Sequence, residues 1–366
     1  MRSNRAFTLI ELLIVIGIIA IMSSIGVGYY FGYYKQTVLR SQADKISSFL
    51  YLVQQKSIGQ EGRTNWGVHF ENPSTGTPYY ASFQGTSYST PVEKFYLDGS
   101  LTYEYPASGQ SLDVVFSKIT GRTYDNQYKK IYLKNTSGEG DRSIRVTPIG
   151  VIAVDDGEVA WWKLDEGSGT LAVDNTVFRS NASFVGAPTW SPIADCRGES
   201  QCLTFSAGNY LSVGNAVPLR ITGNQTIMMW LYPTSFASRR NPYNKAYGGE
   251  GTITQETSGS LSYYYGTYGG DGGSYQGFGS TPITINTWSH VAIVRDLTNM
   301  KLYWYINGKQ VSMTNATYSA AVSGTNGVYI GHGYAGDYVG RIDDVRVYDR
   351  ALTGAEIKKI YEQTRQ

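Results

Sequence analysis

Residues 6–16 read AFTLIELLIVI, an apolar run that a single carboxylate, Glu11, interrupts. A short basic leader with Arg2 and Arg5 precedes this run. A carboxylate inside a membrane helix costs about 2 to 3 kcal/mol even on insertion scales, so it is normally kept only where a partner charge meets it. Because no basic residue lies nearby on the same helix, the partner charge of Glu11 must come from elsewhere.

The stretch that follows Glu11 is long enough to cross a membrane. Residues 12–34 carry no charge, and a bilayer span needs about 20 such residues. The alternatives are an uncleaved signal anchor and an ordinary secretory signal, whose apolar stretch of about 7 to 15 residues ends at a small-x-small cleavage site. The length of the run therefore favours a membrane-spanning helix over residues 7–34.

The N-terminal pattern of a basic leader, a small residue, Phe and then Thr-Leu-Ile-Glu resembles the signature of type IV pilins and type II secretion pseudopilins. The resemblance implies a leader over residues 1–6, which prepilin peptidase cuts after Ala6, and methylation of the new N-terminus, Phe7. It also implies that Glu11 pairs with the N-terminal amine of a neighbouring subunit during filament assembly. Ala6 stands where Gly is more usual. No Pro loosens the middle of the helix, although Gly26 and Gly28 could do so.

The helix is predicted to continue beyond the membrane. Apolar residues recur in steps of three and four, which is typical of an amphipathic helix. They are Leu39, Ala43, Ile46, Leu50 and Val53. With Gly59 as the stop, one helix is predicted over residues 7–58, and the stripe on its second half is available to pack on a sheet.

Short strands separated by Gly, Pro, Asn and Asp are predicted over residues 59–154. This part resembles the β-sheet of minor pilins and of GspH-like or FimT-like pseudopilins, which implies an α+β pilin module: a long N-terminal helix packed on an antiparallel sheet. The predicted strands are Trp66–Phe70, Tyr79–Phe83, Glu93–Tyr96, Leu112–Lys118, Lys130–Lys134 and Ser143–Val146.

Residues 155–366 form a second predicted domain. Alternating apolar residues over many short strands predict two packed antiparallel sheets, and Asn307-Gly308 is a strong hairpin signal. Thr353 and Glu356 have the capping-box spacing of a last short helix. The predicted strands include Leu203–Phe205, Tyr210–Val213, Thr226–Leu231, Trp288–Arg295 and Lys301–Ile306.

Three motifs of this second domain carry a resemblance. They are Trp-Ser-His-Val at 288–291, Tyr-Ile-Asn-Gly at 305–308 and Ile-Asp-Asp-Val-Arg-Val-Tyr at 342–348. In this order they resemble the LamG-like domain of the concanavalin A-like lectin/glucanase superfamily, over roughly residues 158–361. The resemblance implies an all-β jelly-roll sandwich.

The two cysteines, Cys196 and Cys202, lie close together in the sequence. In an exported chain this spacing predicts a small disulfide-closed loop, with two free thiols as the alternative. A metal site would need further ligands, and the three histidines are distant in sequence.

Because the superfamily includes glucanases, a catalytic site has to be considered. A retaining glycosidase needs two carboxyl groups about 5 to 5.5 Å apart, and the Glu-x-Asp-x-x-Glu motif of the family's enzymes does not occur in this sequence. Asp343 and Asp344 are adjacent, so on a strand they face opposite sides. The GxGxxG pattern at 331–336 lacks the helix and βαβ context of a dinucleotide site. The chain is predicted not to be an enzyme.

LamG-like domains often hold one structural calcium ion, which takes oxygen ligands. By resemblance, Asp174 and Asp343 are the candidate ligands. The alternative is that each carboxylate caps a turn or accepts hydrogen bonds from backbone amides.

The stretch 243–278 is rich in aromatic residues among glycines, which suggests a sugar or cell-surface ligand site. Alternation along a strand would place only about half of these rings on one face. The candidate ligand-binding residues are Tyr263, Tyr265, Tyr268 and Tyr275.

Composition limits the function classes. The 366 residues carry a net charge of +2 and no block of like charge, which argues against nucleic-acid binding. The predicted function is a type IV pilin-like subunit, minor or at the tip because a bulky domain would crowd a filament, that displays a lectin-like domain for adhesion or glycan binding. The alternative is a type II secretion pseudopilin whose jelly roll contacts secreted substrate.

This function implies partners and a location. The partners would be other pilin subunits, prepilin peptidase, the inner-membrane assembly platform and a carbohydrate or cell-surface ligand. The chain would cross the cytoplasmic membrane once before assembly and then lie in an extracellular filament, or in the periplasm for a pseudopilin.

Overall fold

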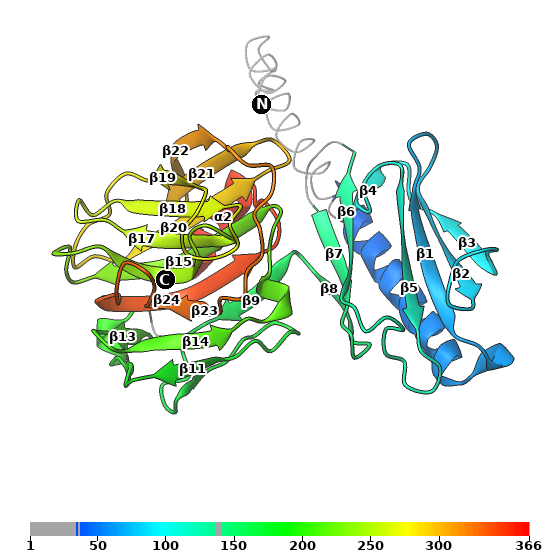
Figure 1. The fold of residues 1–366 in the computed structure, drawn as a ribbon, viewed down its shortest axis with the longest axis horizontal. Coiled ribbons are helices and arrows are strands. Elements are labelled where there is room, and N and C mark those ends of the chain that lie inside the picture. The colour runs from blue at the N-terminus through cyan, green and yellow to red at the C-terminus, as the bar shows by residue number, and fades with distance from the viewer. Residues whose placement is uncertain (1–33, 36, 137–140, 199, 366) are drawn as a thin grey trace, which may run out of the picture. The chain divides into compact units, whose positions relative to one another are not determined.

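The computed structural model describes residues 34–35, 37–136, 141–198 and 200–365 (Figure 1). The leader, the cleavage site between Ala6 and Phe7, Glu11 and the predicted span except Tyr34 lie outside these residues. Among the described residues, no helix has the length and apolar character that crossing a bilayer requires. The chain divides into two compact units between Asp156 and Gly157.

The first unit is built around a helix over residues 37–58. Its predicted apolar stripe is buried: Leu39, Ala43, Ile46 and Leu50 are fully inaccessible, and they pack with residues from the strands of the unit. The helix ends at Ile58, next to the predicted stop at Gly59. Burial of one apolar stripe is what holds an amphipathic helix against a sheet.

Two four-stranded antiparallel sheets complete the first unit, with the short 3₁₀ helix η1 (Glu61–Arg63) after the main helix. The first sheet has the order β3-β2-β1-β5 and the second β4-β6-β7-β8. Strand β3 matches its predicted bounds, whereas β4 was not among the predicted strands. The strands are β1 (Trp66–Asn72), β2 (Tyr79–Gln84), β3 (Glu93–Tyr96), β4 (Leu101–Tyr105), β5 (Gln110–Phe116), β6 (Lys129–Asn135), β7 (Asp141–Val146) and β8 (Ile152–Asp155).

The second unit is a jelly-roll β sandwich of two large sheets. One sheet has the order β10-β11-β14-β23-β16-β17-β18-β19, and we call it the front sheet. Its strands are β10 (Leu171–Ala172), β11 (Ala182–Val185), β14 (Tyr210–Gly214), β16 (Arg240–Ala246), β17 (Gly251–Gln255), β18 (Leu261–Gly266), β19 (Tyr275–Gly279) and β23 (Val328–Ile330).

The other sheet, which we call the back sheet, has the order β12-β13-β24-β15-β20-β21-β22, with β9 paired to β24. The 3₁₀ helices η2 (Ile193–Asp195) and η3 (Val217–Leu219) lie in the connecting loops. The strands are β9 (Glu158–Trp162), β12 (Thr189–Trp190), β13 (Leu203–Phe205), β15 (Gln225–Pro233), β20 (Ser289–Asp296), β21 (Lys301–Ile306), β22 (Lys309–Asn315) and β24 (Gly340–Tyr348).

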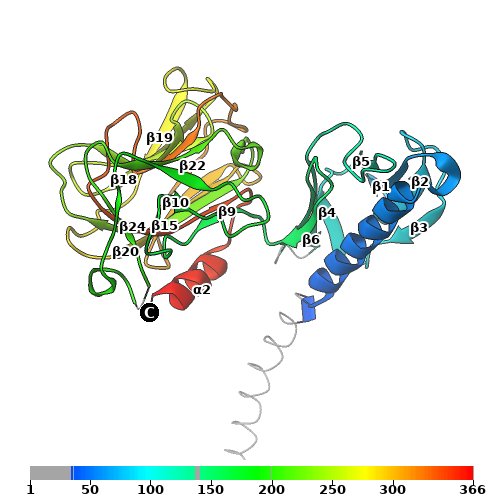
Figure 2. The same cartoon turned by 90° about the horizontal axis from the view of Figure 1, so that it is seen from below.

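The core of the sandwich lies between these sheets and includes two fully buried tryptophans, Trp162 and Trp304. The closing helix α2 (Gly354–Thr364) lies against the back sheet (Figure 2). Its Ile357 belongs to a separate cluster with Met228 and Ala292 of that sheet. Since Met229 and Val291 belong to the core, α2 covers the opposite, outer face of that sheet. Helix α2 therefore leaves the outer face of the front sheet uncovered.

The predicted cap of α2 is confirmed. The hydroxyl of Thr353 accepts a hydrogen bond from the backbone N–H of Glu356, whose side chain accepts one from the backbone of Thr353. This reciprocal capping satisfies two amide groups that a helix start otherwise leaves unpaired.

Candidate functional site

The strand register of the front sheet separates its residues into two faces. One lateral row runs through Ser212, Tyr329, Asn244, Thr252 and Tyr264, which are paired in turn across β14, β23, β16, β17 and β18. Directly paired residues project to the same side of a sheet. This outer face is therefore polar and aromatic.

The next row along the same strands faces the core. It runs through Leu211, Ile330, Tyr243, Ile253 and Tyr263, and each of these side chains is at most 1% exposed. The alternation fixes which tyrosines of the aromatic stretch can meet a ligand.

Two of the predicted ligand residues, Tyr263 and Tyr265, are placed in the core, which corrects that part of the prediction. Both are fully buried. The Tyr263 hydroxyl donates to Gln225 Oε1 at 2.9 Å, and the Tyr265 hydroxyl donates to the carbonyl of Tyr318 at 3.0 Å. Because burial and these bonds fix both rings, neither can present a face to a sugar.

Their neighbour in sequence, Tyr264, belongs instead to a cluster on the outer face, which we call the tyrosine patch: Tyr247, Tyr264, Tyr275 and Tyr334. The ring centroids of Tyr247 and Tyr334 are 4.4 Å apart, and those of Tyr264 and Tyr275 are 5.7 Å apart. Tyr247 also meets Tyr275 edge-on at 5.2 Å. With Tyr275 48% and Tyr334 37% exposed, the patch presents aromatic surface to solvent.

Arg239 holds two rings of the patch in place. Its Nη2 donates to the Tyr264 hydroxyl at 3.1 Å and to the Tyr334 hydroxyl at 2.9 Å. Its Nε donates to Glu256 Oε2 at 2.7 Å, and Nη2 donates to Oε1 at 3.2 Å. A bidentate arginine–carboxylate pair has a defined geometry, so it orients the guanidinium and, through it, both rings.

The electrostatics of Glu256 reflect this pairing. Burial alone would raise its pKa, but the hydrogen bonds from Arg239 and from neighbouring hydroxyls, together with the positive charge, lower the pKa overall. Glu256 is therefore ionised at neutral pH and compensates Arg239. The two charges of this pair therefore offset each other.

The other two predicted ligand residues are exposed. Tyr275 is a member of the patch, and Tyr268, 64% exposed, lies at its rim. A Cβ added at Gly272 would come within 3.7 Å of the Tyr247 hydroxyl and 3.9 Å of the Tyr268 ring, so both tyrosines lie beside that glycine. The patch members Tyr247, Tyr264 and Tyr334 and the positioning residue Arg239 were not among the predicted ligand residues.

The candidate calcium ligand Asp174 is fully buried and already accepts hydrogen bonds from four protein donors. Backbone N–H groups of Trp161 and Thr176 donate to its Oδ1 at 3.0 and 2.9 Å. The Thr176 hydroxyl and the Ser180 N–H donate to its Oδ2 at 2.9 and 2.8 Å. A carboxylate surrounded by donors organises a loop, and this set does not fit a cation.

Asp343 is also engaged by protein groups. Its Oδ2 accepts from Arg197 Nη2 at 2.9 Å, and the Arg197 guanidinium also lies 4.4 Å from the centre of the Trp230 ring. Burial raises the pKa of Asp343 to about 7, with Asp344 adding to the rise and Arg197 opposing it.

The predicted disulfide between Cys196 and Cys202 is present, with an S–S distance of 2.11 Å. It closes the loop that carries Arg197.

No group of three or more His, Cys, Asp and Glu side chains suited to a metal is found among the described residues. The resemblance led us to expect calcium at Asp174 or Asp343, whereas the four hydrogen bonds that Asp174 accepts favour the alternative, a carboxylate that holds a turn. Because the oxygens of Asp174 are satisfied by protein donors, we expect the melting temperature of the full chain to be the same in calcium and in EDTA. A clear rise with calcium, lost in an Asp174→Asn variant, would instead assign an ion to this loop.

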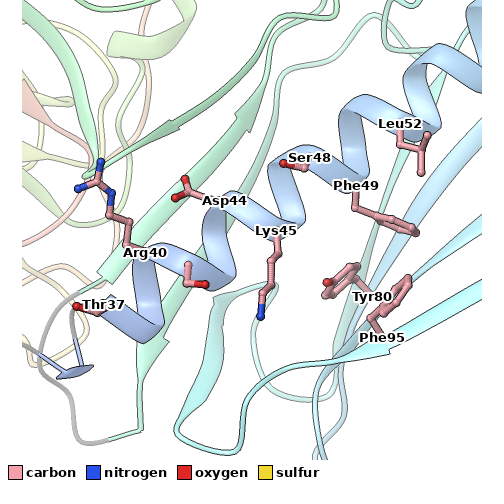
Figure 3. A pocket seen from close by; sticks show the side chains of 10 residues that line it. Thr37, Arg40, Asp44, Lys45, Ser48, Phe49, Leu52, Tyr80 and Phe95 are labelled. Carbon is pink, nitrogen blue, oxygen red and sulfur yellow. The ribbon is translucent and has the colours of Figure 1, made fainter.

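A groove of about 750 Å³ lies in the first unit, beside the helix over residues 37–58 (Figure 3). The rings of Phe49, Tyr80 and Phe95 meet on one side of it, with Phe49 centred 5.3 Å from Tyr80 and 5.2 Å from Phe95. Asp44 is the one carboxylate that lines it. Since glycoside hydrolysis uses two carboxyl groups, this groove does not have the composition of such a site.

Two family models match the chain. The prokaryotic N-terminal methylation motif matches residues 1–27, and the concanavalin A-like lectin/glucanases superfamily matches residues 205–358. No curated protein sequence matches the chain.

Several solved structures are similar in part. The binding domain of botulinum neurotoxin DC in complex with rat synaptotagmin II is 13% identical, with a TM-score of 0.46 over 57% of this chain and 52% of that one. The binding domain of Paraclostridial Mosquitocidal Protein 1 is 14% identical, with a TM-score of 0.46 over 57% and 52%.

Domain 4 of AbnA, a GH43 extracellular arabinanase from Geobacillus stearothermophilus, in complex with arabinotriose, is 16% identical, with a TM-score of 0.42 over 56% of this chain and 98% of that one. The chain spans about half the length of the two toxin binding domains. The chain thus joins an N-terminal methylation motif of the type IV pilin type to a concanavalin A-like jelly-roll domain.

Proposed function

We propose that this protein is a type IV pilin-like filament subunit, minor or at the tip, whose jelly roll binds carbohydrate on a cell or extracellular surface through the tyrosine patch. The observation that carries the ligand side of this proposal is the patch itself, four tyrosines gathered on the outer face of the front sheet and partly oriented by Arg239. Aromatic rings with a few fixed polar groups are typical of ligand sites.

The patch suits a sugar because a pyranose has an apolar C–H face and a rim of hydroxyl groups. The tyrosine rings offer apolar area with little conformational freedom to lose. Around them, the Arg239–Glu256 pair and the tyrosine hydroxyls supply donors and acceptors. The rings and the polar groups together would recognise the shape of a sugar and the positions of its hydroxyl groups.

The proposal is a binding function without catalysis. The adjacent carboxylates Asp343 and Asp344 are held by different partners: Asp343 by Arg197, and Asp344 by Trp161 at 2.6 Å and Arg346 at 3.0 Å. Each is committed to an internal contact, which supports a structural role for both.

The methylation motif supports the filament side of the proposal. In this scheme, prepilin peptidase removes residues 1–6, residues 7–34 cross the cytoplasmic membrane, and residues 7–58 form the filament helix. Residues 59–154 would be the pilin-like sheet domain and residues 155–366 the displayed domain. The partners are other pilin subunits, the peptidase and the inner-membrane assembly platform, and the assembled protein lies outside the cell.

Shearing of surface filaments tests this location. We expect the full chain in the sheared filament fraction, with methylated Phe7 as its N-terminus by mass spectrometry. Recovery in the periplasm alone would support the pseudopilin alternative, in which the jelly roll contacts secreted substrate.

A Tyr264→Ala variant tests the ligand side. We expect the purified full chain in detergent to bind members of a glycan array, and the variant to bind the best of them at least about tenfold more weakly, a loss of about 1.4 kcal/mol that is typical of a central aromatic anchor. Isothermal titration calorimetry would measure the two affinities. Tyr275→Ala should act in the same direction.

Two control variants distinguish loss of the aromatic ring from a general effect of the substitution on the protein. Tyr264→Phe keeps the ring and should retain most of the affinity, while Tyr124→Ala removes a tyrosine of the first unit that is 54% exposed and should change nothing. Equal binding by Tyr264→Ala and the unaltered chain would contradict a role for the patch.

A further inference from the structure

A second aromatic cluster lies on the same sheet and is distinct from the tyrosine patch. Tyr210 stacks on His332 with centroids 4.3 Å apart and an interplanar angle of 18°. Tyr329 meets both rings edge-on, at 5.8 Å from Tyr210 and 5.5 Å from His332. We call Tyr210, Tyr329 and His332 the second ledge.

The second ledge and the tyrosine patch share one face of the sheet. Tyr329 pairs with Asn244, Asn244 with Thr252, and Thr252 with Tyr264, so Tyr329 and Tyr264 project to the same side three strands apart. At the usual strand separation this is about 14 Å. Tyr210 is two residues from Ser212, the partner of Tyr329, so it projects to this side as well.

One loop, residues 331–337, contributes to both clusters. His332 belongs to the second ledge, and Tyr334, two residues later, belongs to the tyrosine patch. The loop therefore links the two clusters across the strands that lie between them.

The loop is fixed to the sheet beneath it. Asn241 is fully buried, and its Oδ1 accepts from the N–H of Ala335 at 2.7 Å while its own N–H donates to the carbonyl of Gly336 at 3.0 Å. A Cβ added at Gly333 would come within 2.7 Å of the Asn241 side chain, which shows how closely the backbone approaches the sheet. Aromatic surfaces held this way need little ordering when a ligand binds.

Each cluster has a basic side chain that lies against a nearby carboxylate. His332 Nδ1 lies 2.6 Å from Asp337 Oδ1, and Arg239 lies against Glu256. Burial would raise the pKa of Asp337, but the Gly208 N–H and His332 lower it overall. Arg239 and the His332 ring each lie against a carboxylate, so neither presents an unpaired positive group that would attract an acidic sugar.

We propose that the ligand of this face is an uncharged, linear oligosaccharide that runs across the strands and stacks on the tyrosine patch and the second ledge at once. This inference rests on the proposed glycan-binding function and adds the length and charge of the ligand. One sugar ring is too short to span the two aromatic surfaces, whereas a chain of several rings reaches both.

The test compares short and long chains of one linkage. The probes are disaccharides and hexasaccharides of neutral glucans, xylans, galactans, mannans and arabinans, titrated by calorimetry into the full chain in detergent. For the linkage that binds, we expect the hexasaccharide to bind at least about tenfold more tightly than the disaccharide, because it gains a second set of contacts.

Variants at each cluster assign the contacts. Tyr210→Ala should bring the affinity for the hexasaccharide down towards that for the disaccharide and leave the disaccharide unaffected. Tyr264→Ala should weaken both. Tyr210→Phe keeps the stacked ring and should behave like the unaltered chain, and equal melting temperatures would show that the variants are folded.

The outcomes are distinct. Equal affinities for disaccharide and hexasaccharide, a hexasaccharide affinity that Tyr210→Ala leaves unchanged, or tighter binding of a uronic-acid chain than of every neutral one would overturn this inference and leave the patch as a glycan site. Absence of binding to every glycan would overturn the proposed ligand function and this inference with it.

Discussion

Replacing Glu250 with Gln should lower the free energy of unfolding of the second unit by about 3 to 5 kcal/mol, the usual cost of leaving one partner of a buried ion pair uncompensated. Lys245 Nζ lies 3.3 Å from Glu250 Oε1, and the two side chains are 1% and 0% exposed. The carboxylate also accepts from the Ser323 hydroxyl at 2.7 Å and from the Gly324 N–H at 3.3 Å. Glutamine keeps the shape and one acceptor but removes the charge.

The free energy of unfolding of Glu250→Gln should rise with pH. Burial lowers the pKa of Lys245, and Glu250 opposes that shift, so without Glu250 the pKa should fall further. Between the lowered pKa and the ordinary value of about 10.4, the unfolded chain binds more protons than the native one, so stability rises with pH. Urea denaturation of Glu250→Gln from neutral pH upward should show this rise.

A double variant provides the control for this pair. Lys245→Met combined with Glu250→Gln removes both charges, so it should be more stable at neutral pH than Glu250→Gln alone, and its pH dependence should be weaker. If Glu250→Gln unfolds with the same free energy as the unaltered chain, the ion pair contributes nothing and the account of Lys245 is wrong.

The sequence predicted the bounds of several strands and the start of helix α2, because short sequence patterns determine both. The bounds of β3, β13 and β21 match the sequence prediction residue for residue, because alternation and flanking turn residues define such strands. The capping box of α2 needs only Thr353 and Glu356 at the right spacing, and it forms as predicted.

Strands β16 and β17 could not be predicted by the same signals. Their outward positions include Asn241, Asn244 and Thr252, which are polar but at most 3% exposed. Asn241 is buried by the loop over residues 331–337, and Asn244 and Thr252 bond to each other at 2.8 Å. Burial of polar side chains by a distant segment leaves no apolar alternation in the sequence.

The tyrosine patch overlaps the aromatic stretch over residues 243–278, but its members could not be predicted residue by residue. Side chains alternate along β18, so Tyr264 faces the side opposite to Tyr263 and Tyr265. The apolar Leu261 lies on the same side as Tyr263 and Tyr265, which indicates that these two tyrosines face the core. Tyr334 and Arg239 join Tyr264 from positions 70 residues onward and 25 residues back in the sequence, and the strand pairing that brings them together is a tertiary property.

The largest functional effect is expected at the N-terminus, where Glu11→Ala should reduce incorporation of the chain into filaments at least tenfold. The proposed partner of the carboxylate is the N-terminal amine that cleavage creates at Phe7 of a neighbouring subunit. The attraction between these two charges is strongest where water is excluded. A tenfold loss of incorporation corresponds to a loss of only about 1.4 kcal/mol in the free energy of assembly. Immunoblotting of sheared filaments against whole cells would measure the incorporated fraction.

The defect should lie in assembly and not in membrane insertion, because removing a carboxylate lowers the cost of placing the helix in a bilayer by about 2 to 3 kcal/mol. Mass spectrometry should therefore still find cleaved, methylated Phe7 in the Glu11→Ala membrane fraction. Thr8→Ala, an uncharged polar change on the same helix, should assemble normally, whereas Ala6→Lys should accumulate as uncleaved precursor. Wild-type incorporation of Glu11→Ala, or its failure to be cleaved, would contradict the proposed pairing of Glu11 with a neighbouring N-terminus.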